Sequence, residues 1–384
     1  MNKTIMAAML AGLAAPALAS TTDILIGLDS KIDFGPGGQV NVKPGADAVL
    51  VMEISSPAHP KIRASLPPVH SLLGPPTNLQ ITLDGKLGLV ANSVNSVQDG
   101  DKWKTMPDDK LYVIDLAASP PKLIDTVTVH KQPSGLLVIS HKGDLVLIAN
   151  RAGKSITALS IQGTSVKVIG EIPTGTEVAG IAITPDGKRA FAVMNLVNKV
   201  AVFEIDGQKI TYDKAMDIPA GLNPCNIDIM PDGKYAIASA TGAGGNNADL
   251  LTVIETAGPH PHVVQIATAG TGPEGFAIAP NGKWAVTPLL LGSGAKHADW
   301  FYTKGGQAVL LHLEADGQVR SGNRLPLGGL PGGVAFSPDS QYGYVGNYLD
   351  KNVQVFRVAG GKLLATGVTL SLPEQPASLR GPAR

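Results

Sequence analysis

The chain has 384 residues, and its 31 basic side chains balance 31 acidic ones without a long run of either sign. This balance disfavours a nucleic acid or an anionic membrane as a partner, because either would favour a basic surface. Glycine (45) and proline (29) are abundant, whereas aromatic residues make up 4% of a chain that is 44% hydrophobic. Such a composition excludes disorder and is typical of many short strands joined by tight turns.

Residues 1–19 predict a secretory signal peptide. Lys3 is followed by an apolar run over residues 5–15, and Ala17-Leu18-Ala19 forms a site of the small-x-small type. The run is too short to span a bilayer, and no later stretch approaches the roughly 20 apolar residues that a spanning helix needs. We therefore expect cleavage after Ala19, a periplasmic or secreted mature chain of residues 20–384, and no insertion in a membrane.

Three strands without an evident first partner are predicted at residues 24–28, 48–54 and 61–66. From residue 76 to about residue 372 a unit then repeats six times: a strand led by proline, a tight turn, a second strand that often ends in asparagine, and two more strands. The aligned turn positions lie 44 to 58 residues apart, at 85, 143, 187, 233, 282 and 340. A repeat of this length with four strands per unit predicts the blades of a β-propeller.

A seventh proline-led strand, Pro376-Ala377-Ser378-Leu379, ends the chain without partners after it. Its missing partners are the three N-terminal strands, so strands from both termini should close the ring in one blade. Closure of this kind removes the exposed sheet edges of an open stack. The predicted fold is all-β: a single domain over residues 20–384, built as a seven-bladed β-propeller with four antiparallel strands per blade.

The repeat resembles that of the bacterial YVTN-repeat β-propellers. The similarity lies in Pro331-Gly332-Gly333, Pro231-Asp232-Gly233-Lys234, Tyr344-Val345-Gly346-Asn347 and Asn352-Val353-Gln354-Val355, and it extends over roughly residues 48–380. It implies the seven-bladed fold and an architecture similar to that of lactonase-type propellers. It does not specify chemistry, because relatives of this architecture include lactone hydrolases, haem d1-binding domains and amine dehydrogenase subunits.

Four connections are longer than a hairpin needs, and all are predicted on one face of the ring: residues 30–45, 93–109, 241–249 and 291–306. Long connections of this kind are more often functional than structural. On this face the candidates for acid–base catalysis, if the protein is an enzyme, are Glu274, His297 and Asp299. The candidates for ligand binding are Asn78, Trp103, Asn226 and Trp300.

Several of these candidates also have a structural interpretation. Trp300 could pack its loop onto the blade while His297 faces solvent, and the two asparagines could hydrogen-bond between strands. No metal site is predicted, because His260-Pro261-His262 lies in a hairpin on the opposite face and lacks a third ligand. Cys225 is the only cysteine, which excludes an intramolecular disulfide and a covalently attached c-type haem.

The leading functional expectation is an exported, non-enzymatic propeller that binds a small molecule or a protein partner on the face with the long loops. The first alternative is a lactonase-like hydrolase that uses His297 or Glu274 with a loop carboxylate. The second is an accessory protein for a redox enzyme or a haem-like cofactor. The sequence names no cofactor, ligand or oligomeric state.

Overall fold

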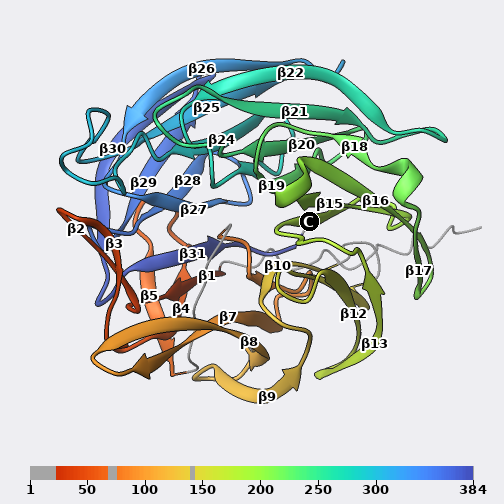
Figure 1. The fold of residues 1–384 in the computed structure, drawn as a ribbon, viewed down its shortest axis with the longest axis horizontal. Coiled ribbons are helices and arrows are strands. Elements are labelled where there is room, and N and C mark those ends of the chain that lie inside the picture. The colour runs from red at the N-terminus through yellow and green to blue at the C-terminus, as the bar shows by residue number, and fades with distance from the viewer. Residues whose placement is uncertain (1–22, 68–75, 139–142, 384) are drawn as a thin grey trace, which may run out of the picture.

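The computed structural model describes residues 23–67, 76–138 and 143–383. Seven antiparallel sheets stand around a central channel, as Figure 1 shows. The predicted seven-bladed β-propeller is therefore confirmed. The predicted signal peptide at residues 1–19 lies outside the described residues. Within the described part of the chain, no helix is long and apolar enough to cross a membrane.

The first three blades follow one another along the chain, from the channel outward. Blade one holds β6 (Leu79–Ile81), β7 (Leu87–Asp99), β8 (Lys102–Asp115) and β9 (Lys122–Thr128). Blade two holds β10 (Pro133–Val138), β11 (Leu145–Asn150), β12 (Ser155–Gln162) and β13 (Ser165–Pro173). Blade three holds β14 (Ile181–Ile183), β15 (Arg189–Met194), β16 (Lys199–Asp206) and β17 (Lys209–Tyr212), and β18 (Ile218–Pro219) also pairs with β16. Its connections include two 3₁₀ turns, η1 (Asn195–Val197) and η2 (Lys214–Met216).

Blades four to six have the same order. Blade four holds β19 (Pro224–Ile229), β20 (Tyr235–Ala240), β21 (Asp249–Glu255) and β22 (His262–Gly270). Blade five holds β23 (Ala277–Ile278), β24 (Trp284–Leu289), β25 (Gln307–Leu313) and β26 (Val319–Pro326). Blade six holds β27 (Pro331–Phe336), β28 (Tyr342–Asn347), β29 (Asn352–Ala359) and β30 (Lys362–Ser371).

Blade seven is built from both ends of the chain, as predicted. The strand β31 (Pro376–Arg380) pairs antiparallel with β1 (Asp23–Leu28), and β4 (Ala48–Glu53) and β5 (Lys61–Leu66) complete the sheet. Figure 1 shows β31 beside β1 although they lie at opposite ends of the sequence. The register places Leu379 opposite Ile26, and both side chains are buried.

The repeated Asp-Gly turn has a local cause that is visible in blade three. The Thr184 hydroxyl donates to Asp186 Oδ1 at 2.6 Å, and the same oxygen accepts the Lys188 N–H at 3.0 Å. Between them Gly187 has a φ of 69°, which a residue without a side chain adopts at no steric cost. The carboxylate thus bridges both sides of the turn, and equivalent bonds occur in blades one and six.

Adjacent blades pack through apolar side chains and approach closely at the channel. Between blades six and seven, Tyr344 and Val353 pack on Ile24 and Ile26 in a single buried cluster. At the channel, a Cβ added to Gly135 would collide with the backbone of Gly180 and of the residue before it. The blades converge at this point, which leaves room only for small residues at the start of the first strands.

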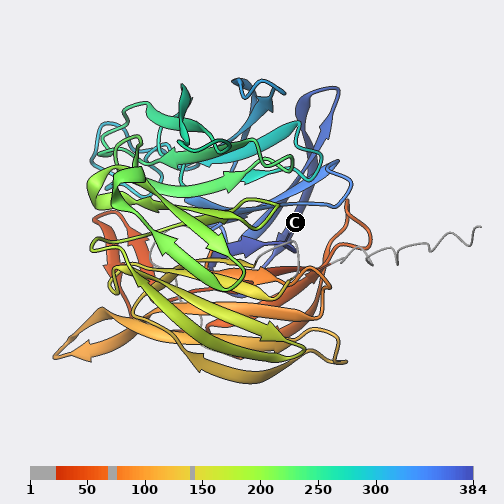
Figure 2. The ribbon, with the colours of Figure 1, turned by 90° about the vertical axis from the view of Figure 1, so that its right-hand side faces the viewer.

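Two of the predicted long loops contain strands. The predicted loop at residues 93–109 is wrong as a loop: β7 and β8 continue through it as a two-stranded ribbon that turns at Gly100. This ribbon extends beyond the rest of its blade (orange in Figure 2). The predicted connection at residues 30–45 contains a small hairpin of β2 (Ile32–Gly35) and β3 (Gly38–Asn41).

Candidate active site at the channel mouth

One mouth of the channel opens into a cleft of about 690 Å³. Three of the predicted long connections contribute to its wall: the β2–β3 hairpin, the connection before β21 in blade four, and the connection before β25 in blade five. The residues that matter for its chemistry are Phe34, Asp249, Glu274, Lys296, Asp299 and Phe301. The β7–β8 ribbon of blade one contributes no residue to this wall.

Glu274 lies at the inner end of blade five, where the ring places it in the cleft. It follows Pro273, which forms an isolated bridge with Leu289. It also precedes Gly275, where a Cβ would collide with the carbonyl oxygen of Gly332 in the next blade. The chain is therefore closely confined on both sides of Glu274. Burial raises the pKa of this carboxyl to about 7, while the nearby Arg151 acts in the opposite direction.

Arg151 contributes a positive charge beside Glu274 that sequence reasoning missed. It directly follows β11, and its backbone N–H donates to the carbonyl of Gln132 at 2.9 Å. Its Nε lies 3.9 Å from Oε2 of Glu177, in the connection from blade two to blade three. One signal could have found it: among the strands that end in asparagine at Asn92, Asn150 and Asn347, only Asn150 is followed by a charged residue.

Cys225 lies close to Glu274 but is not a nucleophile in this state. Its Sγ is 3.6 Å from the carbonyl oxygen of Ser239 and 3.7 Å from that of Glu274. Burial and the negative charge of Glu274 raise the pKa of the thiol to about 12. Because the thiolate is the reactive form, the thiol is inert near neutral pH.

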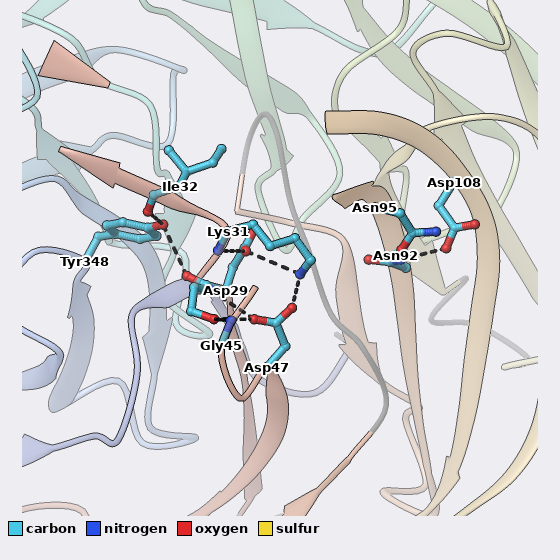
Figure 3. Close-up of polar contacts among 10 residues, drawn as sticks. Asp29, Lys31, Ile32, Gly45, Asp47, Asn92, Asn95, Asp108 and Tyr348 are labelled. Atoms are coloured by element: carbon cyan, nitrogen blue, oxygen red, sulfur yellow. Dashed lines mark hydrogen bonds and ion pairs between the residues drawn. The ribbon is translucent and has the colours of Figure 1, made fainter. Parts of the chain in front are cut away.

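The β2–β3 hairpin is held over the cleft by a buried ion cluster (Figure 3). Lys31 is 2% exposed, and its ammonium group pairs with Asp29 at 3.5 Å and, more closely, with Asp47. Burial lowers the pKa of Lys31, and the charge of Asp29 opposes that shift. The Tyr348 hydroxyl donates to the carbonyl oxygens of Asp29 and Ile32, at 3.1 and 2.7 Å, and so binds the base of the hairpin to blade six.

His297 and Asp299 come from the blade-five connection, but they do not form a catalytic pair here. His297 is exposed, its backbone N–H donates to the carbonyl of Pro36, and its ring lies 4.3 Å from that of Tyr302. Asp299 Oδ2 accepts the backbone N–H of Lys296 at 3.1 Å, which stabilises its own turn. Among the described residues no hydrogen bond joins His297 to Asp299 or to Glu274. Of these three residues, Asp299 and Glu274 line the cleft and His297 does not.

The two predicted tryptophans lie away from the cleft wall. Trp300 is 82% exposed and makes an edge contact with Phe301, with ring centroids 5.6 Å apart. Trp103 is on the blade-one ribbon, opposite Gln98. Their role in ligand binding remains a prediction that this geometry does not favour.

The two predicted asparagines are buried and make the hydrogen bonds of the structural interpretation. Asn78 Nδ2 donates to the carbonyl oxygen of Ala91 at 2.6 Å, within blade one. Asn226 Nδ2 donates to the carbonyl of Phe276 at 3.4 Å, which joins blade four to blade five. Asn226 also lines a second cavity, of about 400 Å³, toward the Asp-Gly turns at the other end of the channel.

The described residues contain no group of three or more His, Cys, Asp or Glu side chains that could hold a metal ion. His262 instead lies on an exposed hairpin, with its Nε2 3.6 Å from Glu255 Oε2. This placement agrees with the surface turn expected for His260-Pro261-His262.

The known proteins to which the chain is similar are propellers of the same fold. Residues 113–214 match the family described as "Lactonase, 7-bladed beta-propeller". No curated protein sequence matches the chain. Among solved structures, a proposed 6-phosphogluconolactonase from Bacteroides fragilis is similar, with 16% identity and a TM-score of 0.69, over 95% of this chain and 99% of that one.

Two further structures have the same fold. The periplasmic gluconolactonase PpgL of Pseudomonas aeruginosa is 18% identical, with a TM-score of 0.63, over 93% of this chain and 98% of that one. The hydrazine synthase of Kuenenia stuttgartiensis is 20% identical, with a TM-score of 0.61, over 81% of this chain and 90% of that one. The chain is thus a seven-bladed β-propeller similar in architecture to the lactonase-type propellers.

Proposed function

We propose that the protein is an exported lactone hydrolase that acts in the cleft at the channel mouth. The observation that carries the proposal is Glu274, a cleft carboxyl whose pKa of about 7 suits a general base near neutral pH. The similarity to lactonase-type propellers supports the same conclusion, and the periplasmic location of one structural neighbour supports export. This function takes precedence over non-enzymatic binding, because binding alone gives no reason for a carboxyl with this pKa beside a guanidinium group.

The reaction needs a base, a water molecule and a positive charge. The Glu274 carboxylate takes a proton from water, and the water oxygen bonds to the carbonyl carbon of the lactone. The carbonyl oxygen becomes an oxyanion, which the positive charge of Arg151 stabilises. When the bond to the ring oxygen breaks, that oxygen takes the proton from Glu274. The product is an open-chain hydroxy acid, and Glu274 returns to its starting form.

Replacing Glu274 with glutamine tests this assignment, because the amide keeps the shape of the side chain but cannot accept the proton. We expect kcat/KM for glucono-1,5-lactone to fall at least about 100-fold, the lower end of what general-base catalysis contributes. Proton release during hydrolysis gives the rate. The same substitution at Glu255, which is partly exposed and lies outside the cleft wall, is the control and should leave the rate unchanged. Equal rates for Glu274→Gln and the parent protein would rule out the mechanism.

The pH dependence of the rate follows from the raised pKa of Glu274. Only the ionised carboxylate acts as a base, and a pKa of about 7 means that this form is lost as the pH falls below neutrality. We expect kcat/KM to fall by about tenfold for each unit below about pH 6.5. The rate is measured from about pH 5 to about pH 8 after subtraction of spontaneous hydrolysis. A base with the ordinary glutamate pKa, near 4.3, would give an almost flat profile over that range.

A further inference from the structure

Charged groups are distributed unequally around the cleft. Among its described lining residues, three are carboxylic acids, Asp249, Glu274 and Asp299, and one is a cation, Lys296. Beside Glu274, the guanidinium group of Arg151 is offset by Glu177, 3.9 Å away. Because the carboxyl groups outnumber the cations, the cleft carries a negative charge when they are ionised. Burial raises the pKa of Asp249 and of Glu274, so each carboxyl is protonated to a larger extent at a given pH. The negative charge of the cleft is then smaller, but the cleft does not become positive.

The single lining cation is poorly placed to bind a phosphate. Lys296 is exposed, and its backbone N–H is already bound to Asp299 Oδ2, so a carboxylate lies in its immediate neighbourhood. Phosphate groups are recognised by several converging donors, commonly with a bidentate arginine. A sugar phosphate carries a charge of about −1.5 to −2 near neutral pH and would face the carboxylates in a partly desolvated cleft.

The rest of the wall suits an uncharged polyhydroxy ring. Gln39, Thr241 and Asn246 provide neutral hydrogen-bonding groups that can pair with sugar hydroxyls. Phe34 and Phe301 provide apolar faces. Phe34 is positioned by an edge contact with Tyr348, whose ring centroid lies 5.9 Å away.

We infer that the cleft selects uncharged sugar lactones and discriminates against phosphorylated ones. This inference rests on the proposed function for the reaction, but the selection itself is a property of binding. It can therefore be tested both with substrates and with ligands that cannot react.

The substrate test compares glucono-1,5-lactone with its 6-phosphate at low ionic strength. We expect kcat/KM to be at least about tenfold higher for the unphosphorylated lactone, equivalent to about 1.4 kcal/mol. Asp299→Asn removes one negative charge, and its amide oxygen can still accept the Lys296 N–H. This variant should reduce the preference by about threefold or more, whereas Asp101→Asn, at the exposed tip of the blade-one ribbon, should not change it. A preference for the phosphorylated lactone would overturn the inference while supporting the proposed function.

The binding test uses glucitol and glucitol 6-phosphate, which contain no lactone, with calorimetry as the readout. We expect glucitol to bind at least about tenfold more tightly than its phosphate. If neither lactone is hydrolysed but glucitol is still preferred, the proposed function fails and the selection stands. Tighter binding of glucitol 6-phosphate, or no binding of either compound, would overturn the selection.

Discussion

A chain that ends at Gln375 is expected to be strongly destabilised, because residues 376–384 contain the innermost strand of blade seven. This strand, β31, pairs along β1 and buries Leu379 and Ser378 almost completely. Beyond it, the Ala383 N–H donates to the carbonyl oxygen of Ile81 at 2.9 Å and so joins the C-terminus to blade one.

The expected loss is large because several contributions disappear together. Burial of Leu379 alone stabilises by about 2 kcal/mol, and the ladder hydrogen bonds to β1 are lost as well. The inner edge of β1 becomes an unpaired edge inside the ring. Since a domain of this kind is stable by only about 5–15 kcal/mol, we expect a melting temperature at least about 10 °C lower, or an insoluble protein.

Differential scanning calorimetry measures this change, and a peptide of residues 376–384 added in trans is the control. If ring closure is the cause, the peptide should raise the melting temperature of the truncated protein. A truncated protein that melts like the full chain would show that β31 does not seal the ring.

The fold could be predicted because each blade repeats the same local chemistry. Thr184, Asp186 and Gly187 show why the turn recurs: hydroxyl, carboxylate and glycine act together within four residues, so the pattern is visible in sequence. The blade-one ribbon was mistaken for a loop although it contains the same signal, since Asp99-Gly100 forms its turn. The expected strand ended at Asn92, as the other asparagine-ended strands do, so its continuation to Asp99 was not predicted.

The site was predicted only in part because its members come together through the closed ring. Glu274 could be identified because the equivalent positions in other blades hold small residues, such as Ala179, Gly332 and Ala377. Arg151 follows a strand of blade two and Glu274 belongs to blade five, so no local pattern indicates that the charge of one acts on the other. His297 looked reactive by residue type, but the Asp299 carboxylate accepts the backbone N–H of Lys296 instead of pairing with the imidazole.

The ion cluster under the β2–β3 hairpin was not predicted either, and it leads to the second large effect. Lys31, Asp29 and Asp47 all lie in one blade-seven connection, and each side chain is at least 95% buried. Replacing Lys31 with methionine keeps an apolar stem of similar length but removes the positive charge between two buried carboxylates. Breaking a buried pair in this way typically costs about 3–5 kcal/mol, because the remaining charges are uncompensated.

We therefore expect Lys31→Met to lower the free energy of unfolding by about 3–5 kcal/mol, measured by urea denaturation. Lys104→Met is the matched control, because Lys104 pairs with Asp99 at 2.9 Å where both side chains are more than half exposed. Such a pair contributes about 0–1 kcal/mol.

A triple variant separates the charge effect from a packing effect. Asp29→Asn and Asp47→Asn keep oxygens that can accept the backbone N–H groups of Lys31 and Ser30, at 3.0 and 2.9 Å, but carry no charge. Combined with Lys31→Met they should recover at least about half of the lost stability, because no buried charge is then left without a partner. If the triple variant is as unstable as Lys31→Met alone, the ammonium group acts by filling space and not by neutralising the two carboxylates. If Lys31→Met is no more harmful than Lys104→Met, the cluster does not hold the hairpin, and the wall of the cleft must be fixed by the Tyr348 hydrogen bonds.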